Sequence, residues 1–306
     1  MSNNPVLPPV QRRDLLQRIG IGAMGATAAS ALGATTLIMS SSPAAAWQPT
    51  DVEILNFALN LEYLEAEYYM RAVTGSGLPS NMVTGAGTQG KVTGGSAVNF
   101  KFPLVKGFAQ RIAADEVAHV TFLRTALGSQ AVAEPSIDFQ SSFNTLATAA
   151  GLIQSGGTFD PFADDLSFLL GAYVFEDVGV TAYAGAAPLL TNAANVGYAA
   201  RILGTEGYHA GAIRGILSEV RQGKATDAIS AVRQKLSGVQ DYGTDLDAGT
   251  TATSYEYNIS NVDQNGLSFS RTAGQVLAIV YGGGKSGGLF YPSGVNGTIS
   301  QATVAS

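Results

Sequence analysis

The chain has 306 residues, a net charge of −6 and no cysteine. Without cysteine there can be no disulfide, thiolate zinc site or iron–sulfur cluster, so any metal must be held by oxygen and imidazole ligands. An acidic chain without a basic patch also argues against a nucleic acid as a partner.

The first 46 residues have the pattern of a twin-arginine signal peptide. Arg12 and Arg13 precede an Ala- and Gly-rich apolar stretch over 19–39, and small residues at 44–46 suit a signal peptidase. We therefore predict export by the twin-arginine route to the periplasm or another extracytoplasmic location. A transmembrane anchor is the alternative, but Gly and Ala drive insertion much less than Leu, so we predict no stable membrane anchor.

The first predicted helix runs from Asp51 to about Ala72, and Thr50 with Glu53 forms a capping box at its start. Glu62 lies on its apolar face and is a candidate metal ligand, although Glu65 approaches the same face and could replace it. We expect Glu53 to cap the helix or face solvent, and the same for Glu67. A loop rich in Gly, Thr, Ser and Asn follows over 75–102, and loops of this length are usually functional or disordered.

The second helix is predicted from Pro103 to about Leu127. Its apolar face carries Glu116 and His119, which lie three residues apart and so point the same way. We expect Asp115 to accept a hydrogen bond from the outer ring nitrogen of a histidine across the bundle.

The third helix is predicted from about Phe162 to Ala187, opened by Asp160 and Pro161. Glu176 is its candidate ligand, with Asp177 as the competing residue.

The fourth helix, predicted over about 195–221, repeats the Glu-x-x-His pattern with Glu206 and His209. Thr205 stands where the second helix has Asp115. The two histidines are the only ones in the chain, and each follows a glutamate by three residues, which is unlikely by chance.

We predict short helices near 143–152, 227–236 and 270–281, and β-prone character around 255–259. The expected fold is an all-α four-helix bundle over 47–237, with long loops. Residues 238–306 are expected to form an irregular C-terminal extension that packs on the bundle.

Four glutamates and two histidines on four apolar faces make a six-ligand cage for two metal ions, of a kind built inside helical bundles. The predicted ligands are Glu62, Glu116, His119, Glu176, Glu206 and His209. Such ligands suit Fe or Mn, and Zn would also fit. Tyr69, one heptad after Glu62, is the candidate catalytic residue. The expected partners are metal ions and small oxidants, and a homo-oligomer is compatible with the sequence.

Several motifs resemble the ferritin-like proteins called desiccation-related: Ile54–Tyr69, Asp115–His119, Glu206–His209, Phe269–Thr272 and Val276–Tyr281. The resemblance implies a ferritin-like bundle with a di-metal centre, and the six predicted ligands match those of bacterioferritin-type sites. Thr205 is a departure, because such sequences tend to have Asp there. The long loop and the C-terminal extension also depart from cage-forming ferritins, so a storage shell is not implied.

Three functions follow from these patterns. The first is an oxidoreductase that acts on Fe(II), on peroxide or on both, in oxidative or desiccation stress protection. Catalase-like dismutation would favour manganese, because manganese catalases share this bundle and ligand pattern. The second is a non-enzymatic metal-binding or stress-protective protein, and the third is a metal-free bundle used for surface interaction.

Overall fold

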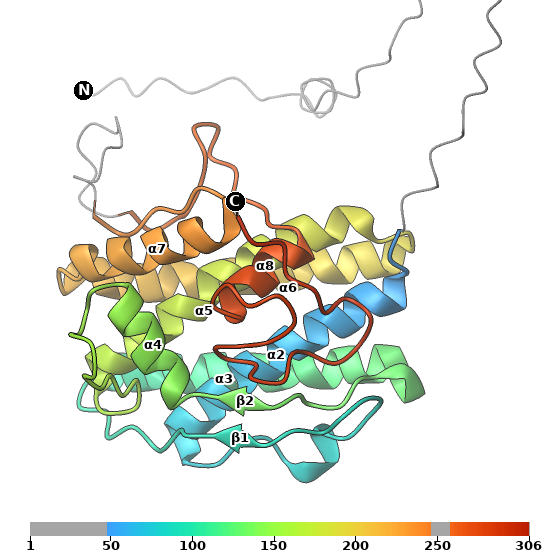
Figure 1. Ribbon diagram of the computed structural model, residues 1–306, viewed down its shortest axis with the longest axis horizontal. Helices are drawn as coiled ribbons and strands as arrows, with labels where there is room; N and C mark the ends of the chain where they lie inside the picture. The colour runs from blue at the N-terminus through green and yellow to red at the C-terminus, as the bar shows by residue number, and fades with distance from the viewer. Residues whose placement is uncertain (1–47, 246–257, 306) are drawn as a thin grey trace, which may run out of the picture. The chain divides into compact units, whose positions relative to one another are not determined.

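A computed structural model describes residues 48–245 and 258–305. Within them, four long helices form a bundle: α2 (Asp51–Thr74), α3 (Pro103–Leu127), α5 (Asp165–Ala186) and α6 (Ala193–Glu219) (Figure 1). Helix α2 packs along α3, and α5 packs along α6. The all-α bundle expected from the sequence is confirmed. The predicted signal peptide (1–46) and most of the β-prone segment (255–257) lie outside the described residues.

Shorter elements surround the bundle. They are the α-helices α4 (Ser141–Ala149), α7 (Gly223–Ser237) and α8 (Ala273–Val280), the 3-10 turns η1 (Ser80–Met82), η2 (Gly128–Gln130) and η3 (Ala187–Leu189), and the two-residue strands β1 (Val92–Thr93) and β2 (Ile137–Asp138). The strands pair in parallel. Helix α8, from the predicted C-terminal extension, contacts α5 and α7, while the domain boundary at residue 237 stays a prediction. None of the described helices has the length and apolar character needed to span a membrane.

Two helix starts show how well local signals work. Thr50 and Glu53 form the predicted capping box of α2, and Pro103 is the first residue of α3. The predicted start of α5 near Phe162 was wrong, because Asp160 caps a separate turn by accepting from the Phe162 amide at 2.9 Å. The N-cap of α5 is Asp164, whose carboxylate accepts from the Ser167 amide at 2.8 Å.

Helix α2 is buried on all sides, whereas its sequence indicates only one apolar face. Every residue from Ile54 to Tyr69 is buried. The Tyr63 hydroxyl donates to the Met82 carbonyl at 3.1 Å, and Nδ2 of the Asn60 side chain donates to the Asn296 carbonyl at 2.8 Å. The Gly-rich segment 75–102 and the C-terminal segment after α8 therefore cover α2, as the ribbon in Figure 1 shows for the latter. Because of this cover, the outer side of α2 is also buried in the hydrophobic core.

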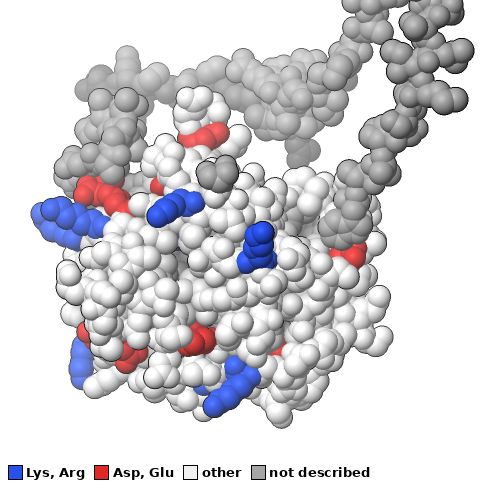
Figure 2. All heavy atoms as spheres, viewed as in Figure 1, with Lys and Arg blue, Asp and Glu red and all other residues white. Residues whose placement is uncertain are grey.

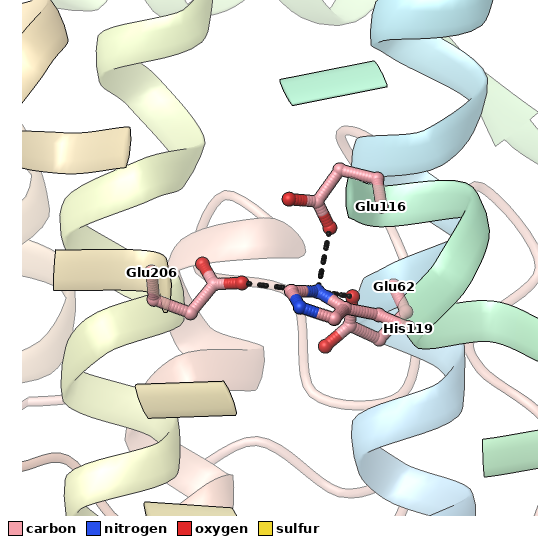
Figure 3. A group of neighbouring side chains, drawn as sticks. All are labelled: Glu62, Glu116, His119 and Glu206. Atoms are coloured by element: carbon pink, nitrogen blue, oxygen red, sulfur yellow. Dashed lines mark hydrogen bonds and ion pairs between the residues drawn. The ribbon is translucent and has the colours of Figure 1, made fainter. Parts of the chain in front are cut away.

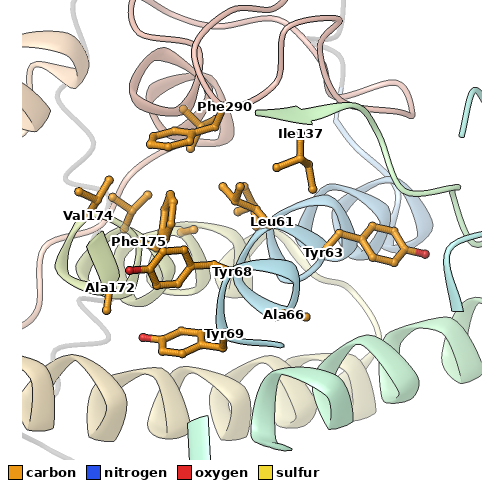
Figure 4. Packing of buried hydrophobic residues seen from close by; sticks show 14 of the residues in the cluster. Leu61, Tyr63, Ala66, Tyr68, Tyr69, Ile137, Ala172, Val174, Phe175 and Phe290 are labelled. Atoms are coloured by element: carbon orange, nitrogen blue, oxygen red, sulfur yellow. The ribbon is translucent and has the colours of Figure 1, made fainter. Parts of the chain in front are cut away.

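Aromatic rings join α2 to α5 next to the centre of the bundle (Figure 4). The Tyr68 ring stacks on Phe168 with centroids 5.6 Å apart and meets Phe175 edge-on at 5.4 Å. Its hydroxyl donates to the Phe168 carbonyl at 2.7 Å, so the buried polar group is satisfied. This packing fixes the rotation of α2 and points the neighbouring Tyr69 toward the bundle interior.

Charged side chains are sparse on the face drawn in Figure 2 and form no cluster of one sign there. Several ionisable groups are instead fully buried. Asp177 of α5 pairs with Arg214 of α6 at 2.8 Å and with Arg233 of α7 at 3.0 Å. Asp241 pairs with Arg233 and with Arg271, both at 2.7 Å. This arginine–aspartate network joins the bundle to the segment that precedes α8.

Candidate metal centre

The six predicted ligands meet in the middle of the bundle. Helix α2 supplies Glu62, α5 supplies Glu176, and α3 and α6 each supply a glutamate and a histidine. They form two overlapping groups of potential ligand atoms, each within 4.8 Å: Glu62, Glu116, His119 and Glu206 in one, and Glu116, Glu176 and His209 in the other. All six side chains are buried, and Figure 3 shows the first group. Glu116 belongs to both groups and lies between the two positions.

Both imidazoles present the same ring nitrogen to the carboxylates. His119 Nδ1 lies 3.1 Å from Glu62 Oε2 and 3.6 Å from Glu206 Oε1. His209 Nδ1 lies 3.0 Å from Glu116 Oε1 and 3.6 Å from Glu176 Oε2. Each pair of helices therefore supplies one imidazole nitrogen within a set of carboxylate oxygens, which is the donor set that Fe and Mn accept.

Several of these donor atoms are buried and make no well-aligned hydrogen bond among the described residues, although His209 Nδ1 and Glu116 Oε1 lie 3.0 Å apart. They are Glu116 Oε1, Glu176 Oε2, both carboxylate oxygens of Glu206, and His209 Nδ1. A buried polar atom without a partner costs free energy, on the order of 1–3 kcal/mol each, and such atoms are rare in folded proteins. Their convergence on two positions fits cations as the missing partners.

Most carboxylates of the centre resist ionisation as long as only protein surrounds them. Glu116 is the exception, because its burial is outweighed by hydrogen bonds from the two histidines, which lower its pKa. Burial raises the pKa of Glu62 to about 7 and that of Glu176 to about 8, and raises the pKa of Glu206 well above its ordinary value. Burial lowers the pKa of His119, but the neighbouring carboxylates, Glu62 first, outweigh burial and bring this pKa to about 11. The site therefore attracts positive charge, which two divalent cations would supply.

Two tyrosines hold carboxylates of the centre. The Tyr69 hydroxyl donates to Glu176 Oε1, and the Tyr183 hydroxyl donates to Glu62 Oε1. Tyr69 was predicted to face the site, whereas the contact of Tyr183 was missed. A signal existed, because Tyr183 follows Glu176 by seven residues, as Tyr69 follows Glu62.

A fifth glutamate lies at the centre. Glu65 was considered as a replacement for Glu62, but the structure buries both side chains at this site. Burial raises the Glu65 pKa well above its ordinary value, and the charge of Glu116 raises it further. A Cβ atom built on Gly179 of α5 would lie 3.2 Å from Glu65 Oε1 and 2.4 Å from Glu206 Oε2. Gly179 thus leaves room for two carboxylates.

Two other acidic residues lie elsewhere. Asp177, the competitor of Glu176, belongs to the arginine–aspartate network and not to the centre. Glu67 was expected to cap or face solvent, which was wrong. It is 2% exposed, pairs with Arg71 Nε at 2.6 Å and accepts from the Leu78 amide at 2.6 Å. Its position inside a helix that is covered on every side explains the difference.

The outer ring nitrogen of His209 makes the contact expected for Asp115. His209 Nε2 lies 3.3 Å from Asp115 Oδ2, and Arg111 Nε donates to the same oxygen at 2.8 Å. Thr205, at the matching place on α6, donates its hydroxyl to the Arg201 carbonyl at 3.3 Å. The two histidines therefore have different outer surroundings.

Two surface hollows flank the centre where α3 and α6 face each other. One has a volume of about 440 Å³ and is lined by His119 together with Phe122, Tyr198, Arg201 and Thr205. The other, of about 380 Å³, is lined by His209 with Asp115, Arg111 and Phe108. Tyr208, which is 81% exposed, borders both. Each histidine can thus be approached by small molecules from outside the bundle.

Comparisons with known proteins agree with this architecture. The sequence model of the ferritin-like domain matches residues 50–219. A protein of Nesocodon mauritianus named ferritin-like catalase Nec2 is 30% identical over 268 residues, which are 82% of this chain and 85% of the relative. The desiccation-related protein PCC13-62 of Craterostigma plantagineum is 30% identical over 242 residues, which are 74% of this chain and 76% of the relative.

Proposed function

The chain belongs to the ferritin-like family that includes desiccation-related proteins, and on this basis we propose that it is a di-metal oxidoreductase that disproportionates hydrogen peroxide. The observation that carries the proposal is the set of buried carboxylate and imidazole atoms, several without a well-aligned hydrogen bond, that converge on two positions. The name of the relative from Nesocodon mauritianus supports peroxide as the substrate. Fe or Mn are the proposed metals, because the donors are oxygen and nitrogen only.

The proposed reaction converts two molecules of hydrogen peroxide into two of water and one of dioxygen. Two redox-active ions held side by side would supply the two-electron exchange with peroxide. The chain supplies the ligands and their orientation. The hydroxyls of Tyr69 and Tyr183 fix one oxygen each of Glu176 and Glu62, which leaves the second oxygen of each carboxylate to face the cluster.

The hollows favour a small substrate. Peroxide would reach the centre through the hollows at His119 and His209, which are large enough for such a molecule. The ligands themselves are buried, and each histidine is less than 9% exposed. A bulky reductant would have to act from outside. Tyr69, buried next to Glu176, is the proposed catalytic residue because it can hold a proton beside that carboxylate.

The test is peroxide turnover by protein loaded with Mn(II) or Fe(II), followed with an oxygen electrode. Glu206→Gln keeps the size of the side chain but removes its charge, and we expect it to lower turnover at least about 100-fold and to reduce bound metal. The matched control is Glu219→Gln, the same change at an exposed position of α6, which should leave both values unchanged.

Two outcomes would contradict peroxide disproportionation. Loaded protein that consumes Fe(II) and dioxygen but releases no dioxygen from peroxide would instead be a ferroxidase. Loaded protein that turns over neither substrate would be a non-enzymatic metal-binding or stress-protective protein. The name of the Craterostigma plantagineum relative, which states no reaction, agrees with this second candidate.

We also propose that the protein acts after export by the twin-arginine route. The support is the sequence of residues 1–46 alone. Because this route carries folded proteins, the metal would be loaded before export.

A further inference from the structure

The helices α3 and α6 carry the same nine-residue pattern with one informative difference. Residues 111–119 read Arg-Ile-Ala-Ala-Asp-Glu-Val-Ala-His, and residues 201–209 read Arg-Ile-Leu-Gly-Thr-Glu-Gly-Tyr-His. Arginine, isoleucine, glutamate and histidine recur at the same places. The aspartate before the glutamate in α3 is a threonine in α6. The half of the centre on α3 and the half on α6 therefore share a sequence pattern but differ at Asp115 and Thr205.

In one half, the carboxylate of Asp115 secures the opposite histidine. It lies 3.3 Å from Nε2 of His209, and Arg111, one turn earlier on α3, holds the carboxylate at 2.8 Å. The His209 ring is thus fixed from both sides, with Nδ1 toward the carboxylates of the centre and Nε2 toward Asp115. Such a partner orients a metal-binding imidazole and raises its basicity.

In the other half, no carboxylate takes this role. Thr205 turns its hydroxyl to the backbone of Arg201, one turn earlier on α6. Within the described part of the chain, Nε2 of His119 makes no hydrogen bond and the guanidinium of Arg201 makes no ion pair. Both residues line the hollow of about 440 Å³ together with Thr205. The His119 ring is therefore held only on its inner side.

We propose that the two metal positions are inequivalent. The position at His209 holds its ion tightly, and the position at His119 exchanges its ion with solvent through the hollow of about 440 Å³ that His119 lines. The cause is the missing aspartate, because loss of such a partner typically costs about 10–100-fold in metal affinity. Asp115 is thus a positioning residue for one metal only. This inference rests on the proposed di-metal function and adds which of the two ions is exchangeable.

The first test uses release of Zn(II), which avoids redox chemistry. Protein loaded with two equivalents is mixed with an excess of a chromogenic chelator. We expect two phases of equal amplitude whose rates differ by about 10–100-fold. Thr205→Asp should slow the fast phase toward the slow one, and Asp115→Thr should accelerate the slow phase. Thr205 is partly exposed, so an aspartate can be placed there without burying a charge.

The second test shows which position is which. Metal binding shifts the ¹⁵N resonance of the imidazole nitrogen that binds the ion, and this chain has only two histidines. NMR of protein labelled with ¹⁵N-histidine therefore reports both positions, and the variants His119→Gln and His209→Gln assign the resonances. With one equivalent of Zn(II), we expect the resonances of His209 to shift and those of His119 to stay. In the doubly exchanged variant D115T/T205D the histidine that shifts should switch, which a purely structural effect would not produce.

The outcomes separate the inference from the proposed function. If two Zn(II) ions bind but leave in one phase, and one equivalent shifts the resonances of both histidines equally, the positions are equivalent and the inference is wrong while the di-metal centre stands. If one equivalent shifts the resonances of His119 instead, the assignment is likewise wrong. If the protein does not bind two ions at all, the proposed function itself fails.

Discussion

Gly179 shows how one residue without a side chain shapes the centre. Its missing Cβ leaves space that the carboxylates of Glu206 and Glu65 occupy. In a helix interior, alanine would be favoured over glycine by about 1 kcal/mol, so the glycine costs stability here. The space it gives to two buried carboxylates accounts for that cost.

Gly179→Ala should therefore separate stability from metal binding. The new methyl group would lie 2.4 Å from Glu206 Oε2, and this flexible carboxylate would have to move. We expect metal affinity to fall about tenfold or more, while the metal-free protein unfolds at an unchanged or slightly higher temperature. Calorimetry of the metal-free protein and a Zn(II) titration measure the two effects.

The control is Gly204→Ala in α6, where a Cβ would meet nothing within 4 Å. It should stabilise its helix without loss of affinity. Equal affinities for the two alanine variants would mean that Gly179 does not serve the centre.

The convergence of the six predicted ligands could be inferred from the sequence because helical spacing decides which side chains share a face. Glu116 and His119 illustrate this, since three residues on a helix nearly complete one turn. Glu65 could not be placed in the same way. Glu62 and Glu65 have the same three-residue spacing, and only the cover over the other side of α2 shows that both must be inside.

At the scale of helices, Asp51 connects the starts of α2 and α6. Its carboxylate accepts hydrogen bonds from the amides of Thr191 and Asn192 at 2.8 and 3.0 Å and from the side chain of Asn195 at 2.8 Å. The Thr191 amide contributes most to lowering the pKa of Asp51 to about 2. One side chain therefore fixes the relative position of two ligand-bearing helices.

Asp51→Asn should lower stability in a pH-dependent way. The folded pKa lies below the unfolded one, so the contribution of the carboxylate is fully present above about pH 4 and is lost as the pH falls through about 2. Urea unfolding at pH 6 should show the variant to be less stable than the native protein, and the difference should shrink between pH 4 and pH 2. A difference that stays constant over this range would show that the charge of Asp51 is not responsible.

Local signals predicted some helix ends well and failed where a turn competed. Pro103 and the Thr50–Glu53 pair mark true helix starts. The backbone N–H groups of a first helical turn lack partners within the helix; proline has no such N–H, and the capping box supplies acceptors for them. Asp160 carries the same kind of signal but caps a turn that does not continue into a helix. The sequence offers two possible N-caps, Asp160 and Asp164. Only the tertiary structure shows that α5 begins after Asp164.

At the scale of the whole molecule, two clusters of buried ionisable groups differ in how their charges are paired. The arginine–aspartate network of Asp177, Arg214, Arg233, Asp241 and Arg271 is internally paired. The centre has five glutamates against two histidines, and burial raises the pKa of four of these glutamates, so ionising them all requires positive charge beyond what the protein groups supply. This contrast was not predictable from sequence, because Asp177 and Glu176 are neighbours in the chain and differ only in what the other helices place opposite them. The imbalance at the centre is the main physical reason to expect cations there.

The most direct test of this account is a crystal of Mn-loaded or Fe-loaded protein measured at the absorption edge of the metal. The anomalous map should show two peaks inside the bundle, one at Nδ1 of His119 beside Glu62 and one at Nδ1 of His209 beside Glu176, with Glu116 between them. Absence of both peaks in loaded crystals, or peaks only outside this cluster, would contradict the central claim.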